Sequence, residues 1–363
     1  MNNKENLSGA EQKPPRSFDF KKMLLPILMV VLATLLIITA VLFRDEKSEE
    51  VNRQSKTLYG CFDTVSVIYD YSGDSVPEFE RRCTLVENTL RYYHGLLDIY
   101  NDKEGVSGLY EINVKAGIEP VAVGSDVIDF LEFSKQMYTL TGGEVNIAMG
   151  AVTSLWHKCR ADAADDPVGA KLPDGRALSE AALHCDINNL VIDREAGTVY
   201  LADEKMRLDP GALGKGYATE RATDALKLDG AESYLLDIGG NVRAVGAKPS
   251  GNGFNTGIKD PFGNGGYVSV IEISDSSAVT SGGYERYYYV EGQRYHHIID
   301  KDTLTSPDTF ASVTVLTKDS GFADALSTAL FCMDLDEGRA LVGALDGVKA
   351  VWVMPDGTII ECN

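Results

Sequence analysis

The nine residues Asp209-Pro-Gly-Ala-Leu-Gly-Lys-Gly-Tyr217 combine an acid, three glycines and a lysine at a point where the sequence changes character. Residues 191–200, before them, favour strand, and residues 218–226, after them, favour helix. Glycines at such a turn let backbone N–H groups approach a ligand closely, and the N-terminus of the following helix favours a phosphate. Lys215 would add a point charge there. A glycine-rich turn alone is weak evidence, because most loop lysines are simply solvated.

Four further motifs follow this turn. In chain order they are Asp237-Ile-Gly-Gly-Asn241, Thr280-Ser-Gly-Gly-Tyr284, His297-Ile-Ile-Asp300 and Ala323-Asp-Ala-Leu-Ser-Thr328. Together with the turn they resemble the flavin transferases that move FMN from FAD onto a hydroxyl of another protein, often called the thiamine biosynthesis lipoprotein or ApbE family. The resemblance runs from about residue 58 to residue 362. It implies a single α+β fold of two intimate lobes with mixed sheets and a flavin cleft between the lobes.

The residue pattern independently favours α+β, because strands and helices follow one another without a regular βαβ rhythm. Apolar residues at helical spacing predict helices over 76–99, 123–141, 218–226 and 320–332. Strands are predicted over 64–71, 190–192, 198–201, 234–238, 268–273, 287–290, 312–316 and 348–354. The Asp356-Gly357 pair predicts a C-terminal hairpin. Between Cys159 and Leu183, Ala, Asp, Pro and Gly predict an exposed excursion.

Asp324 and Thr328 are four residues apart on the last predicted helix, so their side-chain oxygens would share one face. Hard oxygen ligands of this kind suit Mg²⁺, which completes its octahedron with water and phosphate oxygens. The spacing alone is more often a capping or solvated pair. The resemblance implies that both residues bind the metal together with the backbone carbonyl of Ala212, and that Asp324 is central to catalysis.

The resemblance also implies a set of flavin contacts. Asp209 and Lys215 correspond to positions beside the flavin nucleotide, and His297 to a position near its phosphates. A histidine there could donate to a phosphate or take a proton from an incoming hydroxyl, although it could also be a structural residue of a strand. Residues of the segment Thr141–Ala148 would lie against the adenosine part, through Glu144, Val145 and Asn146.

Two aromatic residues match family positions that pack around FAD. These are Phe62 and Tyr100, and either could instead belong to the core. The motif Thr280–Tyr284 with Arg286 would shape the cleft. The chain departs from the family pattern where Asn146 replaces an aspartate and where Pro210 removes one N–H donor.

The segment Met23–Phe43 is a nearly unbroken apolar run, long enough to cross a bilayer as a helix. Its length and the missing cleavage site favour an uncleaved anchor over a signal peptide, and the missing polar face argues against a soluble core helix. Basic residues before it place residues 1–22 in the cytoplasm. The prediction is a single-pass protein of the cell membrane, with a linker over 44–57 and an extracytoplasmic transferase domain over 58–362.

The net charge of −20 would repel nucleic acid, so a nucleic-acid partner is not expected. The six cysteines show no metal-site spacing. An exported location would allow a disulfide between Cys159 and Cys185, but buried free thiols are an equal alternative.

These observations predict Mg²⁺-dependent transfer of FMN from FAD to a Ser or Thr hydroxyl of an acceptor flavoprotein, with release of AMP. By family analogy the acceptor carries an FMN-binding domain and is a membrane redox subunit or an extracellular flavoprotein. Two alternatives stay open. The same site could hydrolyse FAD to FMN and AMP, or the chain could be a non-catalytic membrane-tethered flavin-binding protein.

Overall fold

An eight-stranded sheet forms the frame of the computed structural model, which describes residues 53–363. Its strand order is β1-β2-β6-β7-β10-β13-β14-β15. The bounds are β1 Gln54–Cys61, β2 Thr64–Asp70, β6 Ser233–Ile238, β7 Asn241–Gly246, β10 Ser277–Gly282, β13 Ser312–Thr317, β14 Lys349–Val353 and β15 Ile359–Cys362.

Every pairing in this sheet is antiparallel. The expectation of mixed sheets was therefore wrong for the strands described. Three of the seven strand pairings are hairpins. Their tight turns reverse the chain and so make the paired strands antiparallel. The first of these turns consists of Phe62 and Asp63, both with positive φ (52° and 54°).

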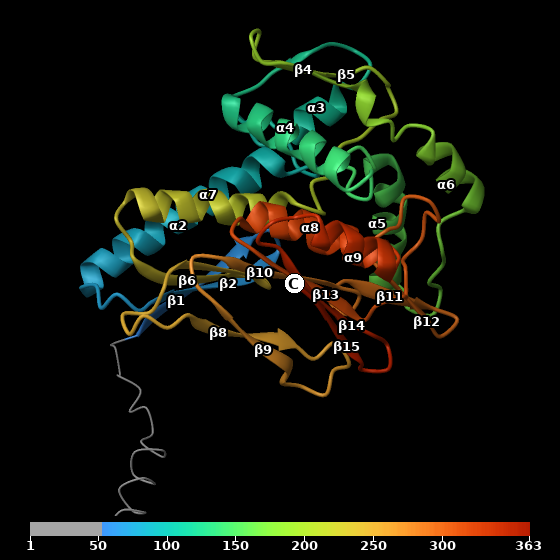
Figure 1. Cartoon of the computed structure of the whole chain (residues 1–363). Helices are drawn as coiled ribbons and strands as arrows, with labels where there is room; N and C mark the ends of the chain where they lie inside the picture. Colours follow the sequence, from blue (N-terminus) through green and yellow to red (C-terminus); the bar gives the residue numbers. More distant parts are fainter. Residues whose placement is uncertain (1–52) are drawn as a thin grey trace, which may run out of the picture. The chain divides into compact units, whose positions relative to one another are not determined.

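Helices cover one face of the sheet (Figure 1). They are α2 (Val76–Leu97), α7 (Gly214–Leu228), α8 (Ser320–Cys332) and α9 (Leu335–Gly343). Buried side chains of α2 and α7 meet those of β2 and β6 in the largest apolar cluster, which includes Leu90, Leu226 and Ile68. Burial of this apolar surface holds the helices on the sheet and fixes where α7 and α8 begin.

A second group of elements lies beyond these helices (Figure 1). It comprises α3 (Leu109–Val114), α4 (Ser125–Leu140), α5 (Gly150–Asp165), α6 (Gly175–Ala182) and a small sheet of order β3-β5-β4. Its strands are β3 Val121–Ala122, β4 Leu190–Asp193 and β5 Thr198–Leu201, and a 3-10 turn, η1 (Ile187–Asn189), precedes β4. Trp156 of α5 and Tyr288 belong to one buried cluster, so α5 packs on the hairpin of β11 (Tyr287–Val290) and β12 (Gln293–His296).

The hairpin of β8 (Phe254–Lys259) and β9 (Tyr267–Ile273) lies on the sheet face that the helices leave free (Figure 1). Phe254 and Ile273 pack there against Ala244 and Ala278. This hairpin makes no ladder with the main sheet, because it forms a two-stranded sheet of its own.

Most predicted elements are confirmed to within two residues, and the predicted helix 320–332 matches α8. The excursion between Cys159 and Leu183 is instead partly helical, since α5 runs to Asp165 and α6 follows. Alanine is the strongest helix former, and both segments contain several alanines. The prediction of a loop gave them too little weight. Residues 54–57 of the predicted linker lie in β1, which begins at Gln54.

The predicted anchor at residues 23–43 lies outside the described residues. Within residues 53–363 no helix is both long and apolar enough to cross a membrane. All six cysteines lie in the described part and are free thiols, so the alternative of a disulfide between Cys159 and Cys185 is not realised.

Candidate active site

A cavity of about 270 Å³ opens where the first hairpin, the end of α2, α5, the stretch 209–215, the end of β10 and α8 meet. Nearly all of the residues proposed from the sequence line it. They are Phe62, Tyr100, Glu144, Asn146, Asp209, Ala212, Lys215, His297, Asp324 and Thr328. We call this cavity the cleft. Val145 is the exception, because its side chain is fully buried in the apolar core and does not reach the cleft wall.

The glycine-rich stretch forms one wall of the cleft, at the point where a loop joins the first turn of α7. Asp209 accepts hydrogen bonds from the N–H of Gly211 (2.9 Å) and from the hydroxyl of Thr153 (2.5 Å). Lys215 lies inside α7 and not in a loop, and its Nζ donates to the carbonyl of Gly239 (2.7 Å). Its ammonium group is thereby held at the cleft wall.

Gly216 serves packing between helices. A Cβ at this position would lie 2.4 Å from Cβ of Asp324 and 2.4 Å from the carbonyl oxygen of Ser320. The first turns of α7 and α8 therefore touch backbone to backbone, which only glycine allows. This contact fixes Asp324 against the glycine-rich stretch.

Asp324, Thr328 and Ala212 form a set of hard oxygens. The Thr328 hydroxyl donates to the carbonyl of Ala212 (3.4 Å) and lies 3.2 Å from the Ser281 hydroxyl. Asp324 is 7% exposed, and its Oδ2 accepts the N–H of Gly216 (2.7 Å). Burial raises the pKa of Asp324, and nearby Lys215 opposes this rise.

These three oxygen groups fit the Mg²⁺ set that the resemblance implies, since they supply one carboxylate, one hydroxyl and one carbonyl. Over residues 53–363 no three His, Cys, Asp or Glu side chains come together as a metal cluster. A Mg²⁺ ion bound by a set with a single carboxylate takes most of its ligands from water and phosphate.

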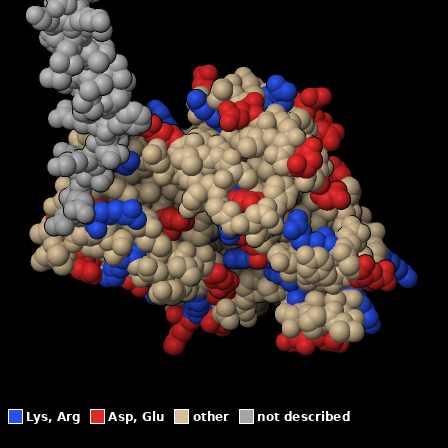
Figure 2. Space-filling model, turned by 90° about the horizontal axis from the view of Figure 1, so that it is seen from below, with Lys and Arg blue, Asp and Glu red and all other residues tan. Residues whose placement is uncertain are grey.

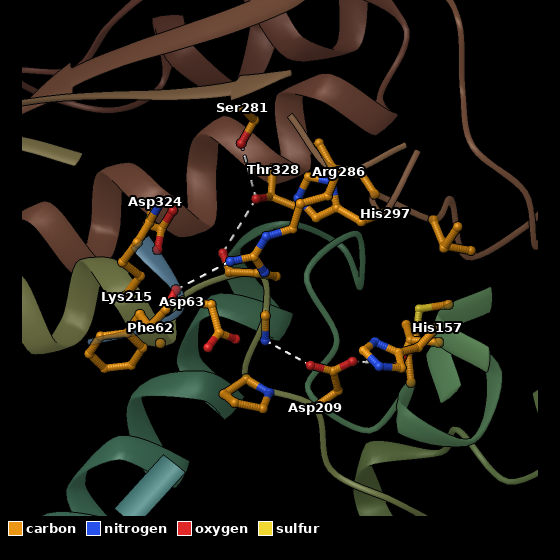
Figure 3. A pocket seen from close by; sticks show the side chains of 18 of the residues that line it. Phe62, Asp63, His157, Asp209, Lys215, Ser281, Arg286, His297, Asp324 and Thr328 are labelled. Atoms are coloured by element: carbon orange, nitrogen blue, oxygen red, sulfur yellow. Dashed lines mark hydrogen bonds between the residues drawn. The ribbon is translucent and has the colours of Figure 1, made fainter. Parts of the chain in front are cut away.

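Three cations converge on the cleft without an acidic partner. Lys215, Arg160 and Arg286 make no salt bridge within the part of the chain that is described. Arg160 contacts the ring of His157 (3.1 Å), and Arg286 donates to the carbonyl of Phe62 (3.2 Å). In Figure 3, Arg286, His297 and Thr328 lie together, across the cleft from Asp209 and His157. Such a group of cations suits the two phosphates of a dinucleotide.

The sequence reasoning missed Arg160 and His157. Both lie on α5, Arg160 inside the predicted excursion and His157 just before it, and only the packing of α5 brings them to the cleft. The pattern itself carried no signal for them. Arg286 was expected to shape the cleft, and the structure adds that its guanidinium faces the same cavity as Lys215.

Aromatic groups line the other part of the cleft. Tyr100 is 59% exposed and stacks on His157, with ring centroids 4.9 Å apart. Tyr100 is therefore not a core residue. Phe62 is tied at its N–H to His94 (3.2 Å) and at its carbonyl to Arg286, so the first hairpin turn is held at the cleft rim.

Glu144 and Asn146 line the cleft but also contact residues that do not line it. Asn146 donates to the carbonyl of Cys185 (2.9 Å) and accepts the N–H of Ala148 (2.9 Å). Glu144 pairs with Lys301 (3.1 Å), while its Oε2 is buried without a partner in the described structure. Asn146 thus shapes the local backbone, and Glu144 keeps an acceptor toward the cleft.

His297 has a buried Nδ1 that no described group contacts. Burial, reinforced by Arg286, His296, Arg160 and Lys215, lowers its pKa to about 3. His297 is therefore neutral in the empty cleft at neutral pH. A neutral imidazole with a free nitrogen can exchange a proton with a bound ligand.

We expect this neutral state to affect stability. Because the unfolded His297 titrates near its ordinary pKa of about 6.5, the unfolded state binds an additional proton below that pH. The stability contributed by neutral His297 is complete above pH 6.5 and is lost as the pH falls toward 3. Between pH 8 and pH 5 the wild type should lose about 2 kcal/mol more than His297→Asn. Urea unfolding at both pH values measures the difference, and equal losses would contradict it.

Acidic and basic side chains are interspersed on the face drawn in Figure 2, and the surface is hollowed near its middle. No patch of only acidic or only basic side chains dominates this face. On this face the mixture of charges suits solubility more than recognition of one charged partner.

The comparisons with known proteins agree with this geometry. The family model described as "ApbE family" matches residues 64–352. A protein of Treponema pallidum named FAD:protein FMN transferase is 35% identical over 268 residues, which cover 69% of this chain and 71% of that protein. A protein of the same name from Klebsiella pneumoniae is 28% identical, with coverage of 77% and 84%.

Solved structures show the same fold. The ApbE protein of Thermotoga maritima superposes with a TM-score of 0.74 at 26% identity and covers 85% of this chain and 97% of its own. The flavin transferase ApbE of Vibrio cholerae gives a TM-score of 0.70 at 24% identity, with coverage of 85% and 96%. From the match over residues 64–352 and from these relatives, we conclude that the chain belongs to the ApbE family.

Proposed function

We propose that this protein is a Mg²⁺-dependent FAD:protein FMN transferase that attaches FMN to a Ser or Thr hydroxyl of an acceptor flavoprotein and releases AMP. The observation that carries the proposal is a single cleft with the oxygen set of Asp324, Thr328 and Ala212 beside three cations free of acidic partners. The names of the related proteins from Treponema and Klebsiella support it.

Each group has a defined part in this reaction. Lys215, Arg160 and Arg286 bind the pyrophosphate of FAD, and Tyr100 offers a ring surface for a planar group of the ligand. Asp324, Thr328 and the Ala212 carbonyl would hold Mg²⁺, which neutralises phosphate charge when bound.

In the reaction the acceptor oxygen forms a bond to the FMN phosphorus while the bond from that phosphorus to the AMP oxygen breaks. His297 is neutral and can accept the hydroxyl proton. Positioning and charge neutralisation supply most of the rate in phosphoryl transfer.

Two other functions use the same residues. With water as the nucleophile the cleft would split FAD into FMN and AMP. A non-catalytic flavin-binding protein would need neither Asp324 nor Thr328, so their arrangement counts against that alternative.

Mass spectrometry separates the three functions. The full chain is incubated with FAD, Mg²⁺ and a candidate FMN-binding domain of a membrane redox subunit. A gain of one FMN on the acceptor that EDTA abolishes supports the transferase. Free FMN and AMP with an unmodified acceptor favour hydrolysis, and unchanged FAD favours simple binding.

Arg160→Gln should weaken FAD binding about 10- to 100-fold, because a charge-assisted hydrogen bond to a phosphate contributes about 1.5–3 kcal/mol. Lys158→Gln is the matched control, since Lys158 lies on the same helix and is solvent-exposed, paired with Asp162. Quenching of flavin fluorescence measures both affinities. Equal affinities of the two variants would remove Arg160 from the site.

We also propose that residues 23–43 anchor the protein in the cell membrane, with the N-terminus cytoplasmic and the catalytic domain outside. The apolar run and the preceding basic residues support this orientation. Protease treatment of intact spheroplasts should digest the catalytic domain and leave cytoplasmic markers whole. A protected domain would contradict the orientation.

A further inference from the structure

A second cavity, of about 660 Å³, lies between the β8–β9 hairpin and the sheet face opposite the helices. Its walls come from the β6–β7 turn, the hairpin with its loop, and β10. We call it the hairpin cavity. The function derived so far makes no use of it.

The hairpin packs on the sheet along its length but leaves one ring free. Phe254 and Ile273 pack into the apolar cluster at one end, and Ile258, near the loop end, is 2% exposed. Tyr267, also at the loop end, is 68% exposed and lines the cavity. The adjoining loop contains Gly263, Gly265 and Gly266, and added Cβ atoms there would meet open space. Exposed main chain without side chains lets another chain approach closely.

The hairpin cavity adjoins the cleft, because Thr280 and Glu285 line both. Gly239 lines the hairpin cavity while its carbonyl accepts the hydrogen bond from Lys215, a cleft residue. Thr280 and Glu285 therefore lie at the border between the two spaces.

The two spaces differ in their cations. Carboxylates line both, but the cleft also holds Lys215, Arg160 and Arg286, whereas the hairpin cavity has Lys259 as its one cation among the lining residues described. The groups that could pair with a pyrophosphate therefore gather in the cleft, and the second space suits a different reactant.

The junction also contains a strand edge without a ladder partner. The ladder between β10 and β7 stops at the pair Val279 and Asn241, whereas β10 continues to Gly282 paired only with β13. The edge of residues 280–282 that faces away from β13 therefore has no ladder partner in the described sheet. Such an edge can hydrogen-bond an extended peptide, as in strand addition.

We propose that the hairpin cavity receives the acceptor protein, whose Ser- or Thr-bearing segment lies there in extended form and delivers its hydroxyl to the cleft past Thr280 and Glu285. This inference rests on the proposed transferase function. It assigns the two substrates to separate entrances, with FAD in the cleft and the acceptor segment under the β8–β9 hairpin.

Two variants on opposite walls test it. Tyr267→Ala removes an exposed ring from the hairpin wall, and Val65→Glu adds bulk and charge to the sheet wall, where Val65 is exposed. Both should raise the KM for the acceptor domain that the wild type labels by about 10-fold or more. The FAD dissociation constant and any acceptor-independent release of FMN and AMP should stay at wild-type values. Val270→Ala is the matched control, because Val270 is exposed on the same strand β9 but does not line the cavity.

The outcomes are distinct. Wild-type KM values in both variants would overturn the inference, as would an equal rise in Val270→Ala, which would indicate a general effect on the hairpin. Weakened FAD binding in both would place them in the FAD site and overturn it too. The wild type is measured first, and if it transfers no FMN to any acceptor domain tested, the proposed function fails and the inference falls with it.

Discussion

Asp324→Asn should abolish Mg²⁺-dependent FMN transfer, with a loss on the order of 10³-fold, and leave the protein folded. The amide keeps an oxygen that can accept the N–H of Gly216, so the contact between α7 and α8 survives. The negative charge that would bind the metal is lost. Because burial raises the pKa of Asp324, the charged form is unfavourable in the empty protein, and the variant should melt at the same temperature or higher.

The melting temperature and the transfer rate are measured on the same preparation over a Mg²⁺ titration. Asp319→Asn provides the control, since Asp319 caps the same helix through the N–H of Phe322 and does not line the cleft. An Asp324→Asn enzyme with full activity in Mg²⁺ would remove this residue from the metal site. Loss of activity in Asp319→Asn of the same size would point to helix disruption.

Gly216→Ala should destabilise the protein by about 3 kcal/mol or more and reduce transfer activity with it. The added Cβ would meet Cβ of Asp324 and the backbone oxygen of Ser320, both at 2.4 Å. A backbone oxygen at the start of α8 cannot rotate away as a side chain can, so the two helices must move apart. Asp324 would then leave its position beside Gly216.

Gly95→Ala is the control for this prediction. Gly95 also lies inside a helix, α2, but the nearest atom to its added Cβ is 4.0 Å away, in the side chain of Lys103. This substitution should raise stability by up to about 1 kcal/mol, because alanine is the better helix former. Urea denaturation compares the two. A Gly216→Ala protein as stable as Gly95→Ala would show that α7 and α8 do not require this close contact.

The parts of the fold that the sequence predicted are those with a strong local period. Residues 320–332 are almost wholly apolar or small and match α8, and the Asp356-Gly357 turn lies between β14 and β15 as expected. Strand β10 was missed because Ser277–Gly282 contains serine, threonine and glycine, which favour turns. Its strand conformation depends on neighbours on both sides, which a local pattern does not contain.

The residues of the candidate site also fall into those that a local pattern predicts and those that depend on tertiary packing. Asp324 and Thr328 were found because one helix turn puts both on one face, and Ala212 lies within reach of Thr328. Arg160 reaches the cleft only through the packing of Trp156 and its helix on the β11–β12 hairpin, far along the chain. Val145 was predicted together with its neighbours Glu144 and Asn146, but its side chain is buried in the core.

The pairing of β2 with β6 joins Asp70 to Tyr234, so most of the first half of the chain is enclosed between two neighbouring strands. The cleft combines Phe62, from the first hairpin, with Asp324 and Thr328, near the C-terminus. During synthesis the early hairpin therefore gains its strand partner only after residue 238 and its cleft partners only near the end of the chain. Any product that ends before residue 328 lacks a complete pocket. Capture of the dinucleotide thus becomes a natural checkpoint for a finished polypeptide, and flavin fluorescence would distinguish full-length molecules from interrupted ones.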